Sequence, residues 1–296
     1  MVFAEKLKLL RKQENMSQEQ LAAKLGVSRQ AVTKWETGAG IPDIENILSI
    51  SKLFDISMDE LFSNERKMNL PKDYLFESVT EYDIDESKHY DMKFGFAKKL
   101  VLSGYKGEKI RVCLASNTIS TLQSDFKVKI DDIKKRMDVD INQKNGVTRA
   151  AAKEEVNIFV QVPVTYIRNM ECAVHAERVE IYSLECDNIE LDLKTSEVVL
   201  EDILGTVEIN CNLDMNIFCN SLNGAIEINQ ISAVSKIHIP EDVMFAAVTK
   251  GIATKISYEK NGKQADVFAV TNADNIADNI IELNGIKSEL IISVDC

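Results

Sequence analysis

The 296-residue chain lacks any long apolar run. No stretch approaches the roughly 18 consecutive apolar residues that a membrane-spanning helix needs. The first residues, MVFAEKLKLLRKQ, carry charges that are spread too evenly for the apolar core of a signal peptide. We therefore expect a cytoplasmic protein with no membrane partner.

Cysteine and histidine are few and lack the spacing of metal sites. The six cysteines include no C-x-x-C pair, and the three histidines are dispersed along the chain. This spacing fits neither a zinc site nor a disulfide framework. We expect buried, reduced thiols, no metal and no other cofactor.

Sequence signatures of catalysis are missing as well. The chain has no nucleophile elbow, no phosphate-binding glycine loop and no histidine–acid pair at a known motif spacing. We therefore predict that the protein is not an enzyme.

The charge is strongly negative but unevenly distributed. The formal net charge is −12, yet residues 1–66 carry 9 Lys and Arg against 10 Asp and Glu, which leaves −11 for the remainder. Between Lys24 and Trp35 there are three basic residues and no acidic one. A phosphate-bearing partner is therefore expected at the N-terminal part of the chain.

Helix start and stop signals divide the first 62 residues into five helices, which we assign to a compact domain over 1–66. Ser17, with Gln20 three residues later, forms a capping-box pattern. Gly26 can adopt the positive φ that ends a helix. Ser28 caps RQAVTKWE, Asp43 precedes IENILSISKLF, and SMDELF forms the fifth, short helix.

The helix predicted over residues 28–36 has two unlike faces. Its apolar residues and those of the preceding helix are predicted to share one core: Leu21, Leu25, Val32 and Trp35. Ala22 and Ala31 are small where the two helices cross. The outer side carries Arg29, Gln30, Thr33 and Lys34. Two helices joined by such a short turn form a helix-turn-helix unit, whose second helix can enter the major groove of DNA.

The segment SQEQLAAKLGVSRQAVTKWETG resembles the helix-turn-helix of the Cro and phage-repressor type, the XRE family. The downstream IPDIENILSISKLFDISMDELF is similar to the last two helices of that family. The resemblance covers about residues 4–62. It implies sequence-specific binding of double-stranded DNA, usually as a dimer on a palindromic operator. We expect a transcriptional regulator that acts as a repressor and forms a homodimer or a higher homo-oligomer.

The outer face of the third helix offers groups that can bind base edges. Arg29 can donate two hydrogen bonds to guanine, and Gln30 can pair with adenine. Thr33 offers a hydroxyl or a methyl group to the next base, and Lys34 can bind a base or a phosphate. We predict that this helix reads the operator.

Further residues are expected at the DNA backbone or in a structural role. Ser17 and Gln18 begin the second helix, where backbone N–H groups and the amide can hold a phosphate. Ser28 and Thr37 are predicted to contact the backbone as well. By family position, Arg11 and Glu36 are expected to form a salt bridge.

The chain beyond residue 66 differs in composition and residue pattern from the helical N-terminal part. Residues 67–90 are acidic and lack clear periodicity, so we interpret them as a linker. Residues 91–296 contain short runs of β-branched residues, which predict an all-β domain. Asn-Gly pairs at 145–146 and 261–262 predict hairpins.

A repeat of apolar–polar–apolar triplets runs from residue 165 to 239. Seven triplets, from Val179-Glu-Ile181 to Ile237-His-Ile239, recur at intervals of about 9–11 residues, so two make a period near 20. This pattern predicts a β-solenoid, with an antiparallel β-sandwich as the alternative. It loosely resembles adhesin-like β-solenoid domains of bacterial proteins. For this domain we expect oligomerisation or partner contact first and binding of an unknown ligand second.

The leading interpretation is a bacterial-type transcriptional regulator. The alternative is a scaffold protein in which the β domain is the working part and the helical domain docks a partner. An enzyme with a DNA-targeting domain is disfavoured because no catalytic set is apparent. The basic residues on the third helix favour the regulator.

Overall fold

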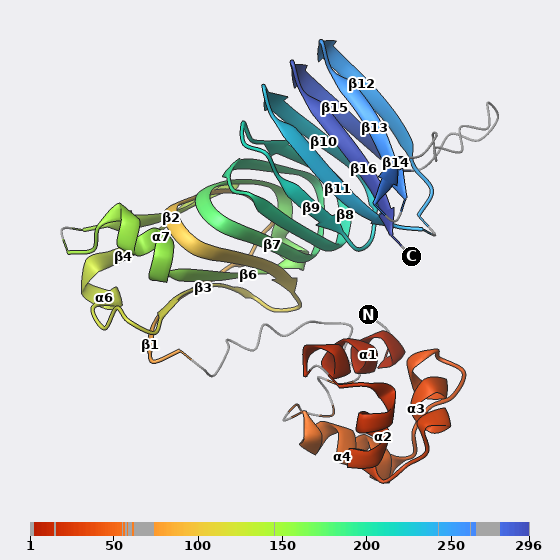
Figure 1. Ribbon diagram of the computed structural model, residues 1–296. Coiled ribbons are helices and arrows are strands. Elements are labelled where there is room, and N and C mark those ends of the chain that lie inside the picture. The colour runs from red at the N-terminus through yellow and green to blue at the C-terminus, as the bar shows by residue number, and fades with distance from the viewer. Residues whose placement is uncertain are drawn as a thin grey trace. The chain divides into compact units, whose positions relative to one another are not determined.

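The structure is a computed structural model. It describes residues 3–14, 16–54, 56, 58, 61, 74–144, 146–241, 243–260, 262–264 and 279–295. The chain divides into two compact units, Met1–Lys67 and Met68–Cys296 (Figure 1). The first unit is helical and the second is a large, predominantly β unit. No helix in the described part of the chain is long and apolar enough to cross a membrane.

Four helices of the first unit are described, and their ends follow the sequence signals. They are α1 Phe3–Gln13, α2 Gln18–Leu25, α3 Arg29–Glu36 and α4 Ile44–Leu53. The capping box of Ser17 and Gln20 is confirmed, and Gly26 ends α2 with φ 70°. Ser28 and Asp43 cap α3 and α4 through their side-chain oxygens. The fifth helix, predicted over 57–62, lies mostly outside the described residues.

The core of the helical unit contains the residues that the sequence predicted. Leu21 and Val32 are fully buried, Trp35 is buried, and Leu25 packs against them at the edge. Ala22 is also buried at the crossing of α2 and α3, and Ala31 packs beside the same core. The two helices therefore cross closely because small side chains lie between them.

The second unit begins with strands β1 to β6, two short helices and a 3-10 turn. They are β1 Phe76–Asp83, β2 Lys88–Tyr105, β3 Lys109–Ser116, α6 Leu122–Asp125, β4 Phe126–Ile133, β5 Arg136–Gln143, α7 Arg149–Glu155, β6 Asn157–Pro163 and the 3-10 turn η1 Val164–Tyr166. β1 pairs antiparallel with β3, β3 with β6, and β4 with β5. β2 runs parallel to β5, β6 and β7.

Two expectations for this region are corrected. Residues 76–83, interpreted as linker, form the edge strand β1, whose acidic side chains face solvent and weaken the hydrophobic pattern. The Asn-Gly pair at 145–146 (Asn145 itself lies outside the described residues) is followed by helix α7, because Thr148 caps RAAAKEE, a run of good helix formers. The β4–β5 hairpin instead turns at Lys134, which has φ 54°.

The remaining strands, apart from β14, form two parallel ladders. They are β7 Ile167–Lys194, β8 Glu197–Asn210, β9 Asn216–Cys219, β10 Asn223–Ile231, β11 Val234–Pro240, β12 Ala246–Ile252, β13 Lys255–Lys260, β14 Lys263–Gln264, β15 Ile280–Ile286 and β16 Glu289–Asp295. In the first ladder Val179 aligns with Val198, then Ile217 and Ile237. In the second, Ile189 aligns with Val207 and Ile226. Partners are 18 to 20 residues apart, which matches the predicted period.

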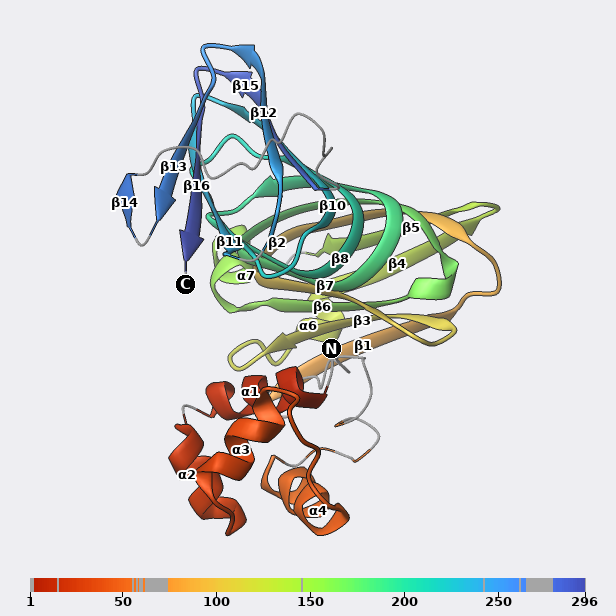
Figure 2. The same cartoon turned by 90° about the vertical axis from the view of Figure 1, so that its right-hand side faces the viewer.

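The last strands of the chain enter the ladders out of sequence order. β15 lies between β10 and β12, and β16 lies between β11 and β13 (Figures 1 and 2). Ile281 aligns with Ile226 on one side and with Ala247 on the other. The hairpin predicted at 261–262 is confirmed by its flanking residues, since Lys260 of β13 pairs antiparallel with Lys263 of β14; Asn261 itself lies outside the described residues.

Outward-facing carboxylates and amides form two neighbouring columns on the second ladder. Glu190 aligns with Glu208, and Glu208 with Glu227. Two residues further along each strand, Asn210 donates to Asp192 at 3.0 Å and accepts from Asn229 at 2.7 Å. Asn210 and Asn229 also donate to Glu190 at 3.1 Å and to Glu208 at 2.6 Å, but the aligned carboxylates still repel one another.

This repulsion gives a first testable prediction. Burial, and then the charges of Glu208, Asp192 and Glu171, raise the pKa of Glu190. Because the raised pKa belongs to the folded state, wild type loses stability as pH rises through the unfolded and then the folded pKa. Glu190→Gln should therefore be more stable at pH 7 by a few tenths to about 1 kcal/mol. Urea unfolding at several pH values should show that this gain disappears well below about pH 4.

Glu289→Gln is the matched control, with the opposite sign. Hydrogen bonds from Ser257 and Lys255 lower the pKa of Glu289. The stabilisation from this carboxylate is present above its unfolded pKa and is lost as pH falls through its folded pKa. Glu289→Gln should therefore lose stability at pH 7. Equal effects of the two substitutions would contradict the assignment of repulsion to the carboxylate column.

Candidate nucleic-acid interface

Helices α2 and α3 meet through a three-residue turn, residues 26–28. The turn begins where the N–H of Val27 bonds to the carbonyl of Ala22 at 3.0 Å. It ends where Ser28 Oγ accepts from the N–H of Ala31 at 3.2 Å. Each bond satisfies a helix-end group that would otherwise have no intrahelical partner. The turn therefore fixes α3 against α2, with Val32 and Trp35 on the buried side.

Three polar side chains of α3 lie free on its outer side. Arg29, Gln30 and Lys34 are exposed. Within the described part of the chain, none of the three side chains has a hydrogen-bond or ion-pair partner. Their donors and acceptors are therefore available to another molecule.

The other predicted contact residues already have internal partners. Ser17 and Ser28 use their hydroxyl oxygens as helix caps. Thr37 donates to the carbonyl of Thr33 at 2.9 Å. Thr33 itself lies within 3.1 Å of Gln18 Oε1 and 3.0 Å of the carbonyl of Arg29. Only their remaining donor and acceptor capacity, together with their backbone groups, is open to a partner.

Gln18 has a role that sequence reasoning missed. Its amide nitrogen donates to Glu36 at 2.9 Å, and its oxygen lies 3.1 Å from Thr33 Oγ1. The side chain of Gln18 therefore connects the start of α2 to two residues of α3, the half-buried Thr33 and the buried Glu36. The sequence shows only that Gln18 begins α2 and that Glu36 ends α3. Because the two residues are 18 positions apart, no local pattern predicts their contact.

The predicted salt bridge between Arg11 and Glu36 is present. Arg11 Nε and Nη2 donate to the two carboxylate oxygens at 2.6 and 2.9 Å, and Nη1 donates to the carbonyl of Met16 at 2.7 Å. Burial disfavours ionisation of Glu36, but the hydrogen bonds from Arg11 and Gln18 outweigh it, so its pKa is lowered. The carboxylate is thus neutralised inside the unit instead of facing a DNA phosphate.

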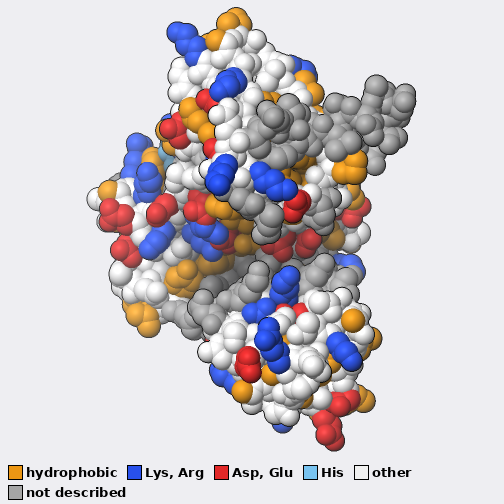
Figure 3. Space-filling model, turned by 45° about the vertical axis from the view of Figure 1, so that its right-hand side comes forward, with side chains coloured by type: hydrophobic (Ala, Val, Ile, Leu, Met, Phe, Trp, Pro, Cys, Tyr) orange, Lys and Arg blue, Asp and Glu red, His pale blue; other side chains and the backbone are white. Residues whose placement is uncertain are grey.

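The charge on this surface suits a polyanion. Lys24, Arg29 and Lys34 are exposed, and no acidic residue stands between Lys24 and Trp35. Basic side chains, in blue, are visible on the surface of the helical unit in Figure 3. A helix with free bidentate groups and surrounding basic residues can bind both base edges and phosphates.

Known proteins resemble this unit in sequence. The helix-turn-helix family profile matches residues 7–61. The chain is 50% identical over 70 residues to the HTH-type transcriptional activator BcrR of Enterococcus faecalis, over 24% of this chain and 34% of that protein. It is 39% identical over 61 residues to the CTXphi transcriptional repressor RstR of Vibrio cholerae, over 21% and 54%. An uncharacterised HTH-type transcriptional regulator of Methanocaldococcus jannaschii is 40% identical over 60 residues, over 20% and 91%.

The matches differ in how much of each protein they cover. The chain spans 34% of the length of BcrR and 54% of RstR. The C-terminal region resembles a solved structure from Clostridium sporogenes ATCC 15579 that is provisionally named as a cell adhesion protein. That likeness has 12% identity and a TM-score of 0.39, over 74% of this chain and 99% of the other.

Proposed function

Because the chain belongs to the helix-turn-helix family of transcriptional regulators, we propose that it binds an operator in double-stranded DNA through α3. The observation that carries the proposal is the set of three exposed, unpartnered side chains on this helix. Arg29 and Gln30 are the base-reading residues, on guanine and adenine respectively. Lys34 contacts a base or phosphate further along the groove.

The remaining contacts position the helix on the DNA backbone. Ser17, Gln18, Ser28 and Thr37 lie at helix ends, where backbone N–H groups, the side-chain amide and the hydroxyls can donate hydrogen bonds to phosphate and sugar oxygens. Thr33 lies between the reading residues and presents its side chain to the next base. Gln18 contributes chiefly by holding α2 against α3 through Glu36.

The second unit is proposed to hold two copies together. A single recognition helix reads only a few base pairs, which is too little to define one site in a genome. Two copies related by a two-fold axis read half-sites about one helical turn apart on a palindromic operator. We also infer that this unit is a β-solenoid, which the in-register parallel ladders support because the strands of a sandwich are mostly antiparallel.

The proposal predicts which substitutions remove operator recognition. Arg29→Ala and Gln30→Ala should each lower the preference for the operator over scrambled DNA by about 1–3 kcal/mol. The fold should be unchanged because both side chains are exposed. Selection of genomic fragments with the purified protein identifies the operator, and binding titrations at one salt concentration measure the preference.

The matched control is Lys52→Ala, which removes an exposed cation from the end of α4. It should weaken binding to operator and scrambled DNA equally, or not at all. Wild-type discrimination in both α3 variants would contradict the proposed reading helix. We propose repression as the outcome of binding, since a dimer on a promoter excludes polymerase. A reporter gene behind the operator should then show more transcription with Arg29→Ala than with wild type.

A further inference from the structure

Basic side chains surround His175 on β7. Arg149 and Lys153 are on α7, which packs against β2 and β7, and Lys194 is the last residue of β7. The guanidinium carbon of Arg149 lies 5.4 Å from the centre of the Phe96 ring. The same ring meets His175 edge-on, with a centroid distance of 4.8 Å. Elements from three parts of the chain thus bring cations to one half-buried imidazole.

These cations have no acidic partner. Within the described residues, Arg149, Lys153 and Lys194 form no ion pair. Burial, followed by the charges of Lys194, Lys153 and Arg149, lowers the pKa of His175. Positive charge is therefore concentrated and uncompensated in a unit whose net charge is strongly negative.

Acidic groups close to the cluster are already engaged. Glu155 of α7 accepts from Thr118 at 2.9 Å, and Asp192 accepts from Asn210 at 3.0 Å. Lys93, the cation on β2 that lines the same groove, is paired with Asp91 at 2.9 Å.

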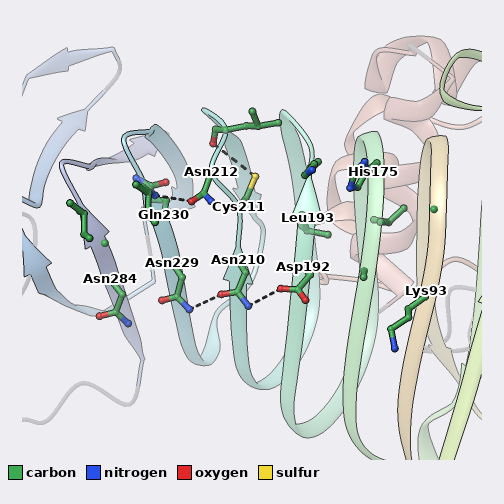
Figure 4. Close-up of a pocket in the computed structure, with 18 residues that line it drawn as sticks. Lys93, His175, Asp192, Leu193, Asn210, Cys211, Asn212, Asn229, Gln230 and Asn284 are labelled. Carbon is green, nitrogen blue, oxygen red and sulfur yellow. Dashed lines mark hydrogen bonds between the residues drawn. The ribbon is translucent and has the colours of Figure 1, made fainter. Parts of the chain in front are cut away.

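His175 and Lys194 lie at one end of a groove that runs across the second ladder. The cavity has a volume of about 770 Å³. Figure 4 shows Asp192, Asn210, Asn229 and Asn284 in one row, with His175 and Lys93 toward one end. The lining also includes the partly exposed aliphatic side chains of Leu213, Ile231 and Ile286. The groove therefore combines a cationic end, a row of amides and apolar surface.

We propose that this groove binds a small organic anion, whose phosphate or carboxylate group is held by Lys194 and His175. An anion there offsets like charges that the protein leaves unpaired, and charge-assisted hydrogen bonds to it are strong. The amide nitrogens of Asn210 and Asn229 already donate within the column, so it is the amide oxygen of Asn229 that accepts from a hydroxyl group on the body of the molecule. Asp192 repels the anionic group, so the ligand can bind only with that group at the cationic end of the groove. The proposal concerns the second unit and does not depend on DNA binding.

The three histidines provide a direct test in the full-length protein. His89, His175 and His238 should give three imidazole signals in an NMR pH titration. The signal that is missing from the His175→Gln variant belongs to His175. Inorganic phosphate should raise the pKa of His175 by about half a pH unit or more relative to chloride at the same ionic strength, because a nearby anion stabilises the imidazolium. His89 and His238 should move much less. Acetate in a parallel titration separates carboxylate from phosphate preference.

Lys194→Ala should raise the pKa of His175 without any ligand, and it should remove most of the response to phosphate. Lys106→Ala, which removes an exposed cation from the β2–β3 turn, is the matched control and should leave both unchanged. Equal shifts of all three histidines would overturn the proposal. So would a full phosphate response in Lys194→Ala.

Discussion

Replacement of Arg11 by alanine is expected to cost the helical unit about 3–5 kcal/mol, because it leaves a buried carboxylate without its counter-charge. The side chain of Glu36 is 1% exposed, and Arg11 supplies two of its hydrogen bonds. A loss of this size is comparable to the whole stability of a small domain. Urea unfolding of the full-length protein, followed by the fluorescence of Trp35, isolates this unit because it holds the only tryptophan.

The pH dependence of this loss has a definite sign. The pKa of Glu36 is lowered in the folded state, so its stabilisation is present above the unfolded pKa and is lost as pH falls through the folded pKa. The difference between wild type and Arg11→Ala should therefore be largest near neutral pH and should shrink in acid. A difference independent of pH would mean that lost packing, and not the charge, causes the destabilisation.

Two controls separate the pair from its surroundings. Lys24→Ala removes an exposed cation from α2 that does not act on Glu36, and it should change stability by less than about 0.5 kcal/mol. In a double-mutant cycle, the Arg11→Met, Glu36→Gln double variant should be destabilised by less than the sum of the two single effects, because each single change already removes the interaction. Additive effects would show that the two side chains do not stabilise each other.

Removal of the second unit is expected to weaken operator binding at least 100-fold, on the order of the avidity that a second linked binding site contributes. Residues 1–67 should be monomeric, whereas the full-length protein should be at least dimeric. Both follow from the proposal that the β unit holds the copies together. Light scattering on the two proteins, with titrations at one salt concentration, measures assembly and affinity.

An apolar surface on the helical unit sharpens this test. Ile41, Ile44 and Leu48 are 78%, 69% and 41% exposed at the start of α4. If residues 1–67 are dimeric, bind the operator as tightly as the full chain and lose both properties on Ile44→Ser, the helical unit dimerises by itself. That outcome would refute the proposed role of the β unit. A monomeric full-length protein would refute the dimer as a whole.

Residues near one another in sequence determined most of the helical unit. Ser17, Ser28 and Gly26 act through backbone groups three or four positions away, so their effects are readable without a structure. The spacing of Leu21, Val32 and Trp35 similarly fixes which sides of α2 and α3 are buried. The free outer face of α3 follows from the same periodicity.

In the β unit, the sequence determined where the strands form and the spacing at which they repeat, but it did not determine which strand pairs with which in every case. Aligned triplets 18 to 20 residues apart form the parallel ladders because β-branched side chains stack on identical positions. The recurring VEIN, IEIN and IELN segments also contained a signal for the column of amides, which only their shared position in the repeat reveals.

Tertiary structure alone decided the contacts between distant segments. The entry of β15 and β16 between earlier strands joins residues 55 positions apart, as in Ile226 and Ile281, and local pattern carries no information about such a choice. Gln18 reaches Glu36, and α7 brings Arg149 to Phe96, for the same reason. Many strands share the same alternation of apolar and polar residues, so pairing is selected by packing and loop closure in the folded chain.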